Sequence, residues 1–480
     1  MGPLPSNAAR SRRLRRPSKV TPARWAAWLT LRRTFEEDAW SDRAFTAIVE
    51  QLELDRDPRE RAFAQRLAYG AVQQAKQLDH VIGALGKRPL RKLDPPVLHA
   101  LRIGIYELLH LQQQTGPDGE RLGSSSAHAA VDQAVELVRG VVGERAVAFT
   151  NAILRRAQVD GAAILDRLDP TIDADRAVLL SMPEWLVARV RESHGEQGIA
   201  ALAAQNEAHA GTPVRINQLH ADASRALDVL GAAGVESAPV AVGGVDVAGA
   251  LVIAGSTARL QPFIDDGLLV VQSLASQLVS HALDPQPGER VLDMCAAPGG
   301  KSTHLASLMQ GRGRLVAVEL HEHRADSIRA LAARTGTDEI IEVLVADATK
   351  LNRSVVGSFD RILVDAPCTG TGVLAARPDA RWKRSEEGLE QLTALQGALL
   401  ASAARLLAPG GMLVYSTCSI LRAEDEDIIA RPPACLEPAS LPPRWGRLLA
   451  GAAHVARTWP QEHDTDGFFI ATFTRQAEGA

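Results

Sequence analysis

Three stretches of the sequence place reactive side chains directly after runs of apolar residues. They are Asp293–Ser302 (DMCAAPGGKS), Asp365–Gly372 (DAPCTGTG) and Ser416–Ser419 (STCS). The second and third stretches carry the cysteines Cys368 and Cys418 among polar neighbours. A single buried cysteine is most often inert packing. Two thiols that follow separate apolar runs beside one cleft instead favour a functional, nucleophilic role.

Small residues fill the turn that follows the first of these apolar runs. They are Cys295, Ala296, Ala297, Pro298, Gly299 and Gly300. Small side chains let the backbone approach a ligand closely, and the start of a following helix adds positive potential. The next apolar run ends in Glu319, where a carboxylate can accept hydrogen bonds from both hydroxyls of a ribose. The third run ends at Asp347, whose carboxylate can meet the amino group of an adenine.

Two phosphate-binding motifs are the alternatives for this turn, and neither matches it. A P-loop needs Gly-x-x-x-x-Gly-Lys-Ser/Thr, but residues 296–302 lack the first glycine at that spacing. The dinucleotide fingerprint Gly-x-Gly-x-x-Gly is absent as well. A nucleoside without a pyrophosphate therefore fits better. The commonest such cofactor on α/β folds is S-adenosylmethionine, which we expect here.

Six apolar runs, mostly separated by helical stretches, would position these side chains. They are Arg290–Met294, Leu315–Glu319, Ile341–Asp347, Arg361–Asp365, Gly411–Thr417 and Phe468–Phe473. Apolar runs that alternate with helices are typical of a parallel sheet covered on both faces. If the first five strands take the order 3-2-1-4-5, the reactive residues meet at the carboxyl edge, where ligands bind. The last run is expected to close an edge of the sheet.

The sequence before this α/β region is helical over about residues 21–158. Arg59–Gln77 has apolar residues at helix-face spacing, Pro95 begins another helix, and His128–Arg139 is amphipathic. Thr115–Ser126 is a loop by composition. Six or so short helices without a strand signal predict an independent helical domain.

A mixed pattern connects the helical and α/β regions. Trp185–Ser193 is helical in pattern, while Val214–Asn217 and Leu251–Ile253 are typical of short strands. We therefore expect four segments along the chain. They are a basic disordered tail (1–24), a helical domain (25–160), a connecting α/β module (161–285) and a Rossmann-like α/β domain (286–476).

Charge is concentrated at the start of the chain. The 480 residues carry a net charge of −4, yet residues 1–24 hold seven basic residues and no acidic one. Removing those seven charges from −4 leaves −11 on the rest of the chain. A body this acidic cannot hold nucleic acid by net charge, so such binding needs local basic patches. The tail is either an arm that touches phosphates or a segment without function.

The composition narrows the class of protein. With 46% hydrophobic and 23% charged residues, a mainly disordered or collagen-like chain is excluded. No run approaches the roughly 18 apolar residues of a membrane span, and the basic start lacks the apolar segment of a secretory signal. Four cysteines without a Cys-x-x-Cys pair are too few for a disulfide scaffold or a metal site, and Cys435 is expected to be structural. We expect a cytoplasmic protein without metal or membrane.

Five further stretches agree with one protein family. They are Arg377–Arg384 (RPDARWKR), Asp466–Phe469 (DGFF), Lys87–Asp94 (KRPLRKLD), His128–Leu137 (HAAVDQAVEL) and Asn151–Arg156 (NAILRR). The first two, with the three stretches described at the outset, resemble the motifs of the Sun/NOP-type RNA cytosine-5 methyltransferases. The last three resemble the NusB-like domain of the bacterial members. The resemblance covers nearly the whole chain after residue 24, with one departure, since Gln272–Ser276 reads QSLAS where the family usually has QDEAS.

The resemblance implies a class I S-adenosylmethionine-dependent methyltransferase that modifies RNA, with 16S ribosomal RNA as the expected substrate. It implies that Cys418 adds to C6 of a cytosine, that Cys368 assists release, and that Asp365 bonds to N3 and N4 of the base. Lys301 would lie near Asp365 and the substrate, where its charge could depress a thiol pKa. By the same resemblance, Lys301 and Asp365 are expected to bind the cofactor together with the turn residues, Glu319 and Asp347. The target base must leave its stack to reach such a cleft.

A basic cluster in the Arg377–Arg384 stretch has two interpretations. Arg377, Arg381, Lys383 and Arg384 surround Trp382. Such a cluster suits phosphate contact and base stacking, but a solvated basic helix gives the same pattern.

Two other functions stay open. A DNA cytosine-5 methyltransferase also uses a Pro-Cys motif, but it would make Cys368 the nucleophile and leave Cys418 unexplained. A non-catalytic RNA-binding assembly factor would need only the helical domain and the basic tail. It predicts an eroded cofactor site, which this sequence does not have.

Overall fold

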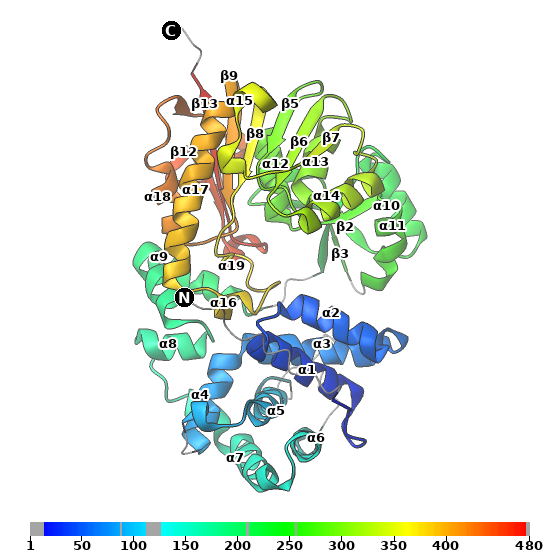
Figure 1. The fold of residues 1–480 in the computed structure, drawn as a ribbon, viewed down its shortest axis with the longest axis vertical. Helices are drawn as coiled ribbons and strands as arrows, with labels where there is room; N and C mark the ends of the chain where they lie inside the picture. Colours follow the sequence, from blue (N-terminus) through cyan, green and yellow to red (C-terminus); the bar gives the residue numbers. More distant parts are fainter. Residues whose placement is uncertain (1–13, 87–88, 112–125, 208–210, 255–256, 477–480) are drawn as a thin grey trace, which may run out of the picture. The chain divides into compact units, whose positions relative to one another are not determined.

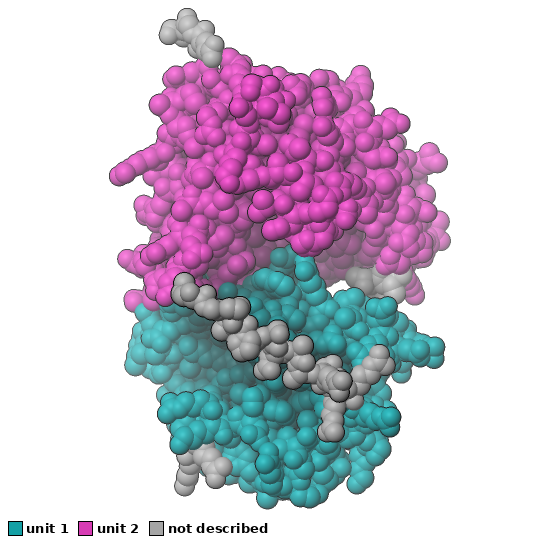
Figure 2. Space-filling view, viewed as in Figure 1, with its two compact units in different colours: residues 1–187, 376–383 teal, residues 188–375, 384–480 magenta. Residues whose placement is uncertain are grey.

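The computed structural model describes residues 14–86, 89–111, 126–207, 211–254 and 257–476 (Figure 1). They fall into two compact units, coloured separately in Figure 2. Unit 1 comprises Met1–Val187 and Ala376–Lys383, and unit 2 comprises Ala188–Ala375 and Arg384–Ala480. Unit 1 thus extends past the predicted boundary at residue 160. The predicted loop Thr115–Ser126, up to residue 125, and residues 87 and 88 lie outside the described residues.

The described secondary structure of unit 1 is helical, as the sequence predicts. The helices are α1 (Pro22–Glu36), α2 (Ser41–Leu52), α3 (Pro58–Gln73), α4 (Ala75–Gly86), α5 (Pro95–Tyr106), α6 (Ala127–Val141), α7 (Val147–Leu165), α8 (Asp173–Leu179), the start of α9 (Glu184–Ala204) and α16 (Ala380–Lys383). Proline occupies the first turn of α3 and of α5, where its fixed φ suits a helix start. The predicted helix Arg59–Gln77 is divided at Gln74 into α3 and α4.

Close packing of α1, α3 and α5 builds the core of unit 1. The Trp25 and Trp28 rings stack with centroids 5.1 Å apart and are fully buried. A side chain at Gly70 would collide with the Tyr106 ring, so the glycine allows α3 and α5 to approach. Arg24 donates from Nε and Nη2 to the two carboxylate oxygens of Glu107 at 2.9 and 2.6 Å. Because α1 begins at Pro22 and Arg24 lies buried in it, the prediction that a disordered tail runs to residue 24 is wrong for its last three residues.

Residues 376–383 pack as part of unit 1. Trp382 Nε1 donates to the Val72 carbonyl oxygen at 2.7 Å, and Arg381 Nη1 donates to that of Ser181 at 3.2 Å. The Asp379 carboxylate accepts from the Ser41 backbone N–H and hydroxyl at 3.0 and 2.7 Å. Lys383 pairs with Asp38. These contacts tie the segment to α2, α3 and the chain before α9.

The phosphate-binding interpretation of this basic cluster is therefore wrong for Arg381, whereas Trp382 and Lys383 are half-buried and bonded within unit 1. Arg381 is 1% exposed, and burial lowers the pKa of its guanidinium to about 9. A solvated basic helix is equally wrong for Arg381. Arg377 is exposed, whereas Arg384 lies in unit 2 and donates to the Thr369 carbonyl oxygen at 3.1 Å. Side chains with long apolar stems can serve a core as well as a surface, which the sequence pattern alone does not distinguish.

A four-stranded antiparallel sheet begins unit 2. Its strands are β1 (Thr212–Ile216), β2 (Ser237–Val242), β3 (Val245–Ile253) and β4 (Leu269–Val271), in the order β2-β3-β1-β4. The helices α10 (Ala223–Ala232) and α11 (Gln261–Asp265) accompany it. The predicted strand Leu251–Ile253 is confirmed as part of β3, and the predicted strand Val214–Asn217 overlaps β1, which ends one residue earlier at Ile216.

A nine-stranded sheet forms the rest of unit 2. Its strands are β5 (Arg290–Asp293), β6 (Arg314–Glu319), β7 (Ile341–Val345), β8 (Phe359–Asp365), β9 (Leu407–Thr417), β10 (Leu436–Pro438), β11 (Leu449–Ala450), β12 (Ala452–Thr458) and β13 (Phe468–Arg475). The order is β11-β12-β13-β9-β8-β5-β6-β7, and β10 pairs with β13. β7, β6, β5, β8 and β9 are parallel neighbours, so the predicted order 3-2-1-4-5 is confirmed.

The prediction that the last apolar run closes an edge of the sheet is wrong. β13 lies between β9 and β12 and is antiparallel to both. The edges of the described sheet are β7 and β11. The last strand is interior because the short strands β11 and β12, whose sequence carries little apolar signal, add outside it.

Alternate side chains of the parallel strands pack against helices on opposite faces. Val291 and Leu363 pack with residues of α12 (Leu274–Leu283), α13 (Gly300–Leu308) and α14 (Glu322–Thr335). Leu292 and Ile362 pack with α17 (Glu386–Leu406), visible along the sheet in Figure 1. The short helices α15 (Arg353–Val356), α18 (Glu426–Ile429) and α19 (Pro460–His463) complete the unit. With both faces covered, polar side chains converge at the carboxyl edge of the strands.

Candidate active site

The turn between β5 and α13 contains five of the six predicted small residues, and the sixth, Gly300, begins α13. Ala296 N–H donates to the Val318 carbonyl oxygen of β6 at 2.9 Å, and Gly299 N–H donates to that of Ala296 at 2.8 Å. Gly299 has φ of 107°, and a side chain there would press on the backbone of Ile328 in α14. A side chain at Gly300 would instead enter open space. The turn thus presents backbone at the carboxyl edge without side chains in front of it.

Asp293 supplies an acceptor at the base of this turn. It is buried at the end of β5, and Ser302 Oγ donates to its Oδ2 at 2.7 Å. Its Oδ1 is buried and has no hydrogen-bonding partner among the described residues. Burial raises the pKa of this carboxyl to about 6. An orphaned buried oxygen beside exposed backbone fits a ligand that brings its own hydrogen-bond donor.

Glu319 and Asp347 follow the next two strands, β6 and β7. Glu319 is 5% exposed, accepts from the His321 N–H at 3.0 Å and lies 3.5 Å from Arg324 Nη2. Asp347 Oδ1 accepts from the Thr349 hydroxyl and N–H, which together with Lys350 hold the pKa of this carboxyl below its ordinary value. Both residues therefore have local partners in addition to any ligand.

Lys301, Asp365 and Ser416 form one hydrogen-bonded group. Lys301 Nζ lies 2.8 Å from Asp365 Oδ2, and Ser416 Oγ donates to Asp365 Oδ1 at 2.8 Å. Asp365 and Ser416 are paired across β8 and β9. Burial alone would lower the pKa of Lys301, but the Asp365 carboxylate outweighs it and raises the pKa above its ordinary value. Lys301 is therefore a cation at neutral pH, and Asp365 is oriented from both sides.

The two cysteines of the motifs lie against each other beside this group. Cys368 Sγ and Cys418 Sγ are 3.3 Å apart, and both thiols are free. Cys368 is buried, whereas Cys418 is more exposed. The hydrogen bond with Cys418, together with burial, raises the pKa of Cys368 well above its ordinary value. The expected lowering of a thiol pKa by Lys301 is therefore wrong for Cys368, which stays a neutral thiol and can donate to Cys418.

The remaining cysteines differ from this pair. Burial, and then the neighbouring Asp293, raises the pKa of Cys295 well above its usual range, so this residue of the turn is also a neutral thiol. Cys435 packs against the core that includes α17. No group of three or more His, Cys, Asp or Glu that could hold a metal ion occurs in the described ranges. None of the helices described is long and apolar enough to cross a membrane.

The QSLAS departure has a structural consequence near the turn. Gln272 Oε1 accepts from Nε of Arg215, which is 1% exposed, at 3.0 Å. Arg215 Nη2 donates to Thr303 Oγ1 in α13 at 3.1 Å, and burial lowers the pKa of this guanidinium to about 9. Ser273 caps α12 by accepting from the Ser276 N–H at 3.3 Å. The two altered positions thus begin a helix rather than supply carboxylates.

The structure brings together the predicted residues Lys301, Asp365, Cys368 and Cys418, and it adds two that the sequence analysis missed. Asp293 and Ser416 stand inside the quoted motifs, next to residues that were singled out. Their position at the ends of predicted strands could have indicated that they belong to the site. A third residue, Glu424, contacts the same loops and is treated below.

Comparisons with known proteins agree with this architecture. The NusB family model matches residues 21–159, and a ferredoxin-like domain of RsmF/B-like methyltransferases matches residues 182–248. The model of the 16S rRNA methyltransferases RsmB/F matches residues 280–474. The sheet order and the strand-end site thus belong to a Rossmann-like methyltransferase domain that follows an all-helical NusB domain.

Full-length relatives define the family. Ribosomal RNA small subunit methyltransferase B of Pseudomonas syringae pv. tomato is 32% identical over 426 residues, covering 87% of this chain and 90% of the relative. The protein of the same name from Vibrio vulnificus is 31% identical over 427 residues, covering 88% and 92%. The chain belongs to the RsmB/F family of 16S rRNA methyltransferases. The predicted resemblance to the NusB-containing Sun/NOP, or RsmB-type, enzymes is confirmed.

Solved structures share the fold. The crystal structure of PH0851 has a TM-score of 0.77 and 26% identity, covering 96% of this chain and 100% of that one. A methyltransferase homologue from Pyrococcus horikoshii has a TM-score of 0.53 and 29% identity, covering 64% of this chain and 100% of its own.

Proposed function

We propose that this protein transfers a methyl group from S-adenosylmethionine to C5 of a cytosine in 16S ribosomal RNA. Relatives along nearly the whole chain are named ribosomal RNA small subunit methyltransferase B. The observation that carries the cytosine-5 assignment is the thiol pair, Cys368 and Cys418, 3.3 Å apart beside the Lys301–Asp365 ion pair. An rRNA substrate implies that the reaction takes place in the cytoplasm.

The residues around the β5–α13 turn would hold the cofactor. They are Cys295, Ala296, Ala297, Pro298, Gly299, Gly300, Lys301, Glu319, Asp347 and Asp365. The open space at Gly300 and the orphaned Oδ1 of Asp293 support a ligand at this place. Bound S-adenosylmethionine supplies a methyl group on a positively charged sulfur.

Cys418 is the proposed nucleophile because C5 of cytosine is too weak a nucleophile to accept a methyl group unaided. Cys418 gives its proton to a base, its sulfur bonds to C6, the C5–C6 double bond opens, and the electron pair of that bond makes C5 nucleophilic. Asp365, held as a carboxylate by Lys301 and Ser416, accepts a hydrogen bond from the N4 amino group of the base, and the Lys301 cation offsets the negative charge that develops on the ring. After methylation the C5 proton passes to a base, the double bond re-forms and the C6–S bond breaks.

The neutral state of Cys368 suits it to the release step. Its S–H can donate a hydrogen bond to the Cys418 sulfur as that sulfur leaves C6, which stabilises the departing thiolate. A DNA-type enzyme would reverse the two roles and require Cys368 to attack. Burial and the raised pKa of Cys368 argue against that assignment.

Methyl transfer to purified RNA tests the proposal. The protein is incubated with methyl-labelled S-adenosylmethionine and with 16S rRNA from a strain that lacks the gene, and the RNA is digested to nucleosides. We expect label in 5-methylcytidine and none when DNA of the same sequence is the substrate. Label in another nucleoside, or in DNA alone, would contradict the proposed function.

A further inference from the structure

We propose that Glu424 is a positioning residue that fixes the two thiols relative to each other, an inference that rests on the proposed function. Glu424 lies in a short 3-10 turn, Arg422–Glu424, and its side chain is fully buried. It comes six positions after Cys418 in the acidic run Glu424–Asp427 (EDED), whose composition is typical of a solvated surface. Its burial is therefore unusual and calls for partners.

The carboxylate of Glu424 binds the residue that follows each thiol. Oε1 accepts from the Thr369 N–H at 2.8 Å, and Oε2 accepts from the Thr369 hydroxyl. Oε2 also accepts from the Ser419 hydroxyl at 2.6 Å. Gln396 Nε2 of α17 donates to Oε1 at 3.1 Å. Because Thr369 follows Cys368 and Ser419 follows Cys418, one buried carboxylate joins the two thiol-bearing loops.

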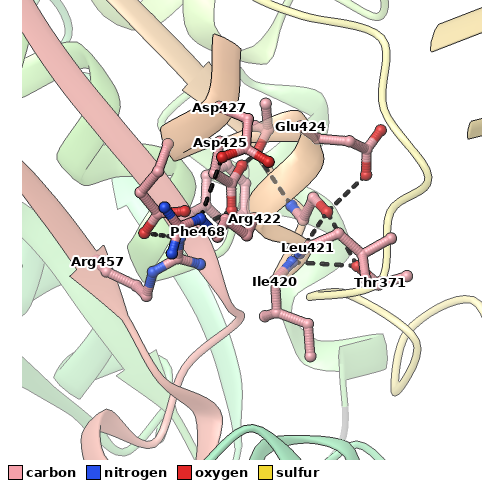
Figure 3. Close-up of polar contacts among 12 residues, drawn as sticks. Thr371, Ile420, Leu421, Arg422, Glu424, Asp425, Asp427, Arg457 and Phe468 are labelled. Atoms are coloured by element: carbon pink, nitrogen blue, oxygen red, sulfur yellow. Dashed lines mark hydrogen bonds and ion pairs between the residues drawn. The ribbon is translucent and has the colours of Figure 1, made fainter. Parts of the chain in front are cut away.

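Thr371 reinforces the junction. Its hydroxyl accepts from the Ile420 N–H at 3.1 Å and lies 3.1 Å from Ser419 Oγ. Ser419 Oγ in turn accepts from the Leu421 N–H at 3.0 Å, and Figure 3 shows Thr371 facing the backbone of Ile420 and Leu421. These contacts close around the Glu424 oxygens, so a shift of one loop is transmitted to the other.

The backbone of Glu424 and the next residue, Asp425, are also fixed by contacts. The Glu424 carbonyl oxygen accepts from the Tyr415 hydroxyl at 2.6 Å. The next residue, Asp425, forms an ion pair with Arg457 at 2.9 Å, and Arg457 also bonds to Glu426 at 2.8 Å. Figure 3 shows Asp425 directed toward Arg457 and Glu424 directed toward Thr371. The carboxylate therefore has a fixed position from which to hold both loops.

Loss of this carboxylate should act on catalysis rather than on cofactor binding. The proposed cofactor turn lies between β5 and α13, whereas the hydrogen bonds of the Glu424 carboxylate go to the loops after β8 and β9 and to α17. A displacement of about 1 Å between reacting groups can cost about a hundredfold in rate. We expect Glu424→Ala to lower kcat by about a hundredfold and to leave KM for S-adenosylmethionine within about twofold of the wild-type value.

Glu424→Gln should restore most of kcat. The amide oxygen can take the place of Oε1, while the amide nitrogen can donate to the Thr369 and Ser419 hydroxyls, which can rotate to accept. The shorter carboxylate of Glu424→Asp cannot reach both loops and should resemble Glu424→Ala. Should Glu424→Ala fail to fold, the Gln and Asp variants still test the proposal. Asp427→Ala is the matched control because it removes an exposed acid of the same run, whose ion-pair partner is the exposed Arg422 and not a residue of either thiol loop.

The experiment measures kcat and KM, melting temperature, and the rate of covalent RNA adduct formation in a Cys368→Ala background. We expect slower adduct formation when Glu424→Ala or Glu424→Asp is added, and a normal rate with Glu424→Gln or Asp427→Ala. A kcat for folded Glu424→Asp equal to that of Asp427→Ala, with normal adduct formation, would overturn the positioning role. An absence of adduct in Cys368→Ala itself would instead count against the proposed function.

Discussion

The strand-end group of unit 2, formed by Lys301, Asp365 and Ser416, and the segment 376–383 of unit 1 both contain charged side chains, yet these side chains bond differently. At the strand end, Lys301 and Asp365 pair with each other while their side chains stay 13% and 26% exposed. In the segment 376–383, Arg381 is 1% exposed and bonds to backbone carbonyl oxygens, as does Trp382. The partly exposed charges of Lys301 and Asp365 can therefore contact a ligand, whereas the buried guanidinium of Arg381 bonds to the protein's own backbone.

The position of a charged residue in the fold determines whether its charge can take part in a reaction. Parallel strands end at one edge, so residues such as Asp365 and Cys418 must meet there whatever else the chain does. A basic and aromatic segment has no such constraint, and its long side chains bond wherever backbone carbonyls are unsatisfied. Charged side chains on the strand-end edge should therefore affect catalysis, and those on the segment should affect stability.

Replacement of a lysine in each region should give the largest difference in kcat between the two regions. Lys301→Met removes the cation that orients Asp365, so kcat should fall by about a hundredfold. Lys383→Met removes a cation that pairs with Asp38 in unit 1, and kcat should stay near the wild-type value. Steady-state methylation of 16S rRNA measures both. Equal losses in the two variants would erase the distinction between the regions.

Arg381→Ala should lower the free energy of unfolding by about 2–4 kcal/mol, because it removes the Arg381 donor from the buried carbonyl oxygen of Ser181 and opens a cavity. Thermal unfolding measures the loss. The salt dependence of RNA binding should not change, since Arg381 does not reach a phosphate. A normal melting temperature with a reduced salt slope would restore the phosphate-binding interpretation.

Glu319→Ala should raise KM for S-adenosylmethionine by about tenfold, which corresponds to the loss of one charge-assisted hydrogen bond. The melting temperature of the cofactor-free protein should be nearly unchanged. Glu342→Ala is the control, because this exposed acid of β7 pairs with Arg314 of β6 away from the carboxyl edge of the sheet. A large loss of stability with normal cofactor affinity would show that Glu319 serves the fold.

Deletion of residues 1–13 should have the smallest effect. This segment holds Arg10, Arg12 and Arg13, and α1 begins only at Pro22. Each phosphate contact on a single strand contributes about −0.7 to the slope of log affinity against log salt, so the slope should flatten by at most about two. Binding titrations at several salt concentrations test this. An unchanged slope would leave the basic tail without a phosphate-binding role.

The sequence predicted the parallel strands and the meeting of the side chains that follow them, because period and spacing carry local information. Apolar runs located the parallel strands, and the residues after them identified Asp365, Cys368 and Cys418. Long-range pairing was less accessible, as the interior position of β13 shows. Glu424 was missed because its acidic run is typical of exposed residues, and only tertiary contacts with Thr369 and Ser419 place its carboxylate in the interior.

The central claim is that Cys418 attacks the base and Cys368 assists release. The most direct test is a denaturing gel of protein–RNA adducts formed by Cys368→Ala, Cys418→Ala and the double variant with 16S rRNA and S-adenosylmethionine. Cys368→Ala should still form the C6–S bond and release product slowly, so an adduct should accumulate in this variant alone. Cys418→Ala should lose activity by about a thousandfold or more and form no adduct, and the double variant should lose the adduct. An adduct only in Cys418→Ala would contradict the account and move the nucleophile to Cys368, and normal turnover without adduct in both single variants would remove covalent catalysis from this site.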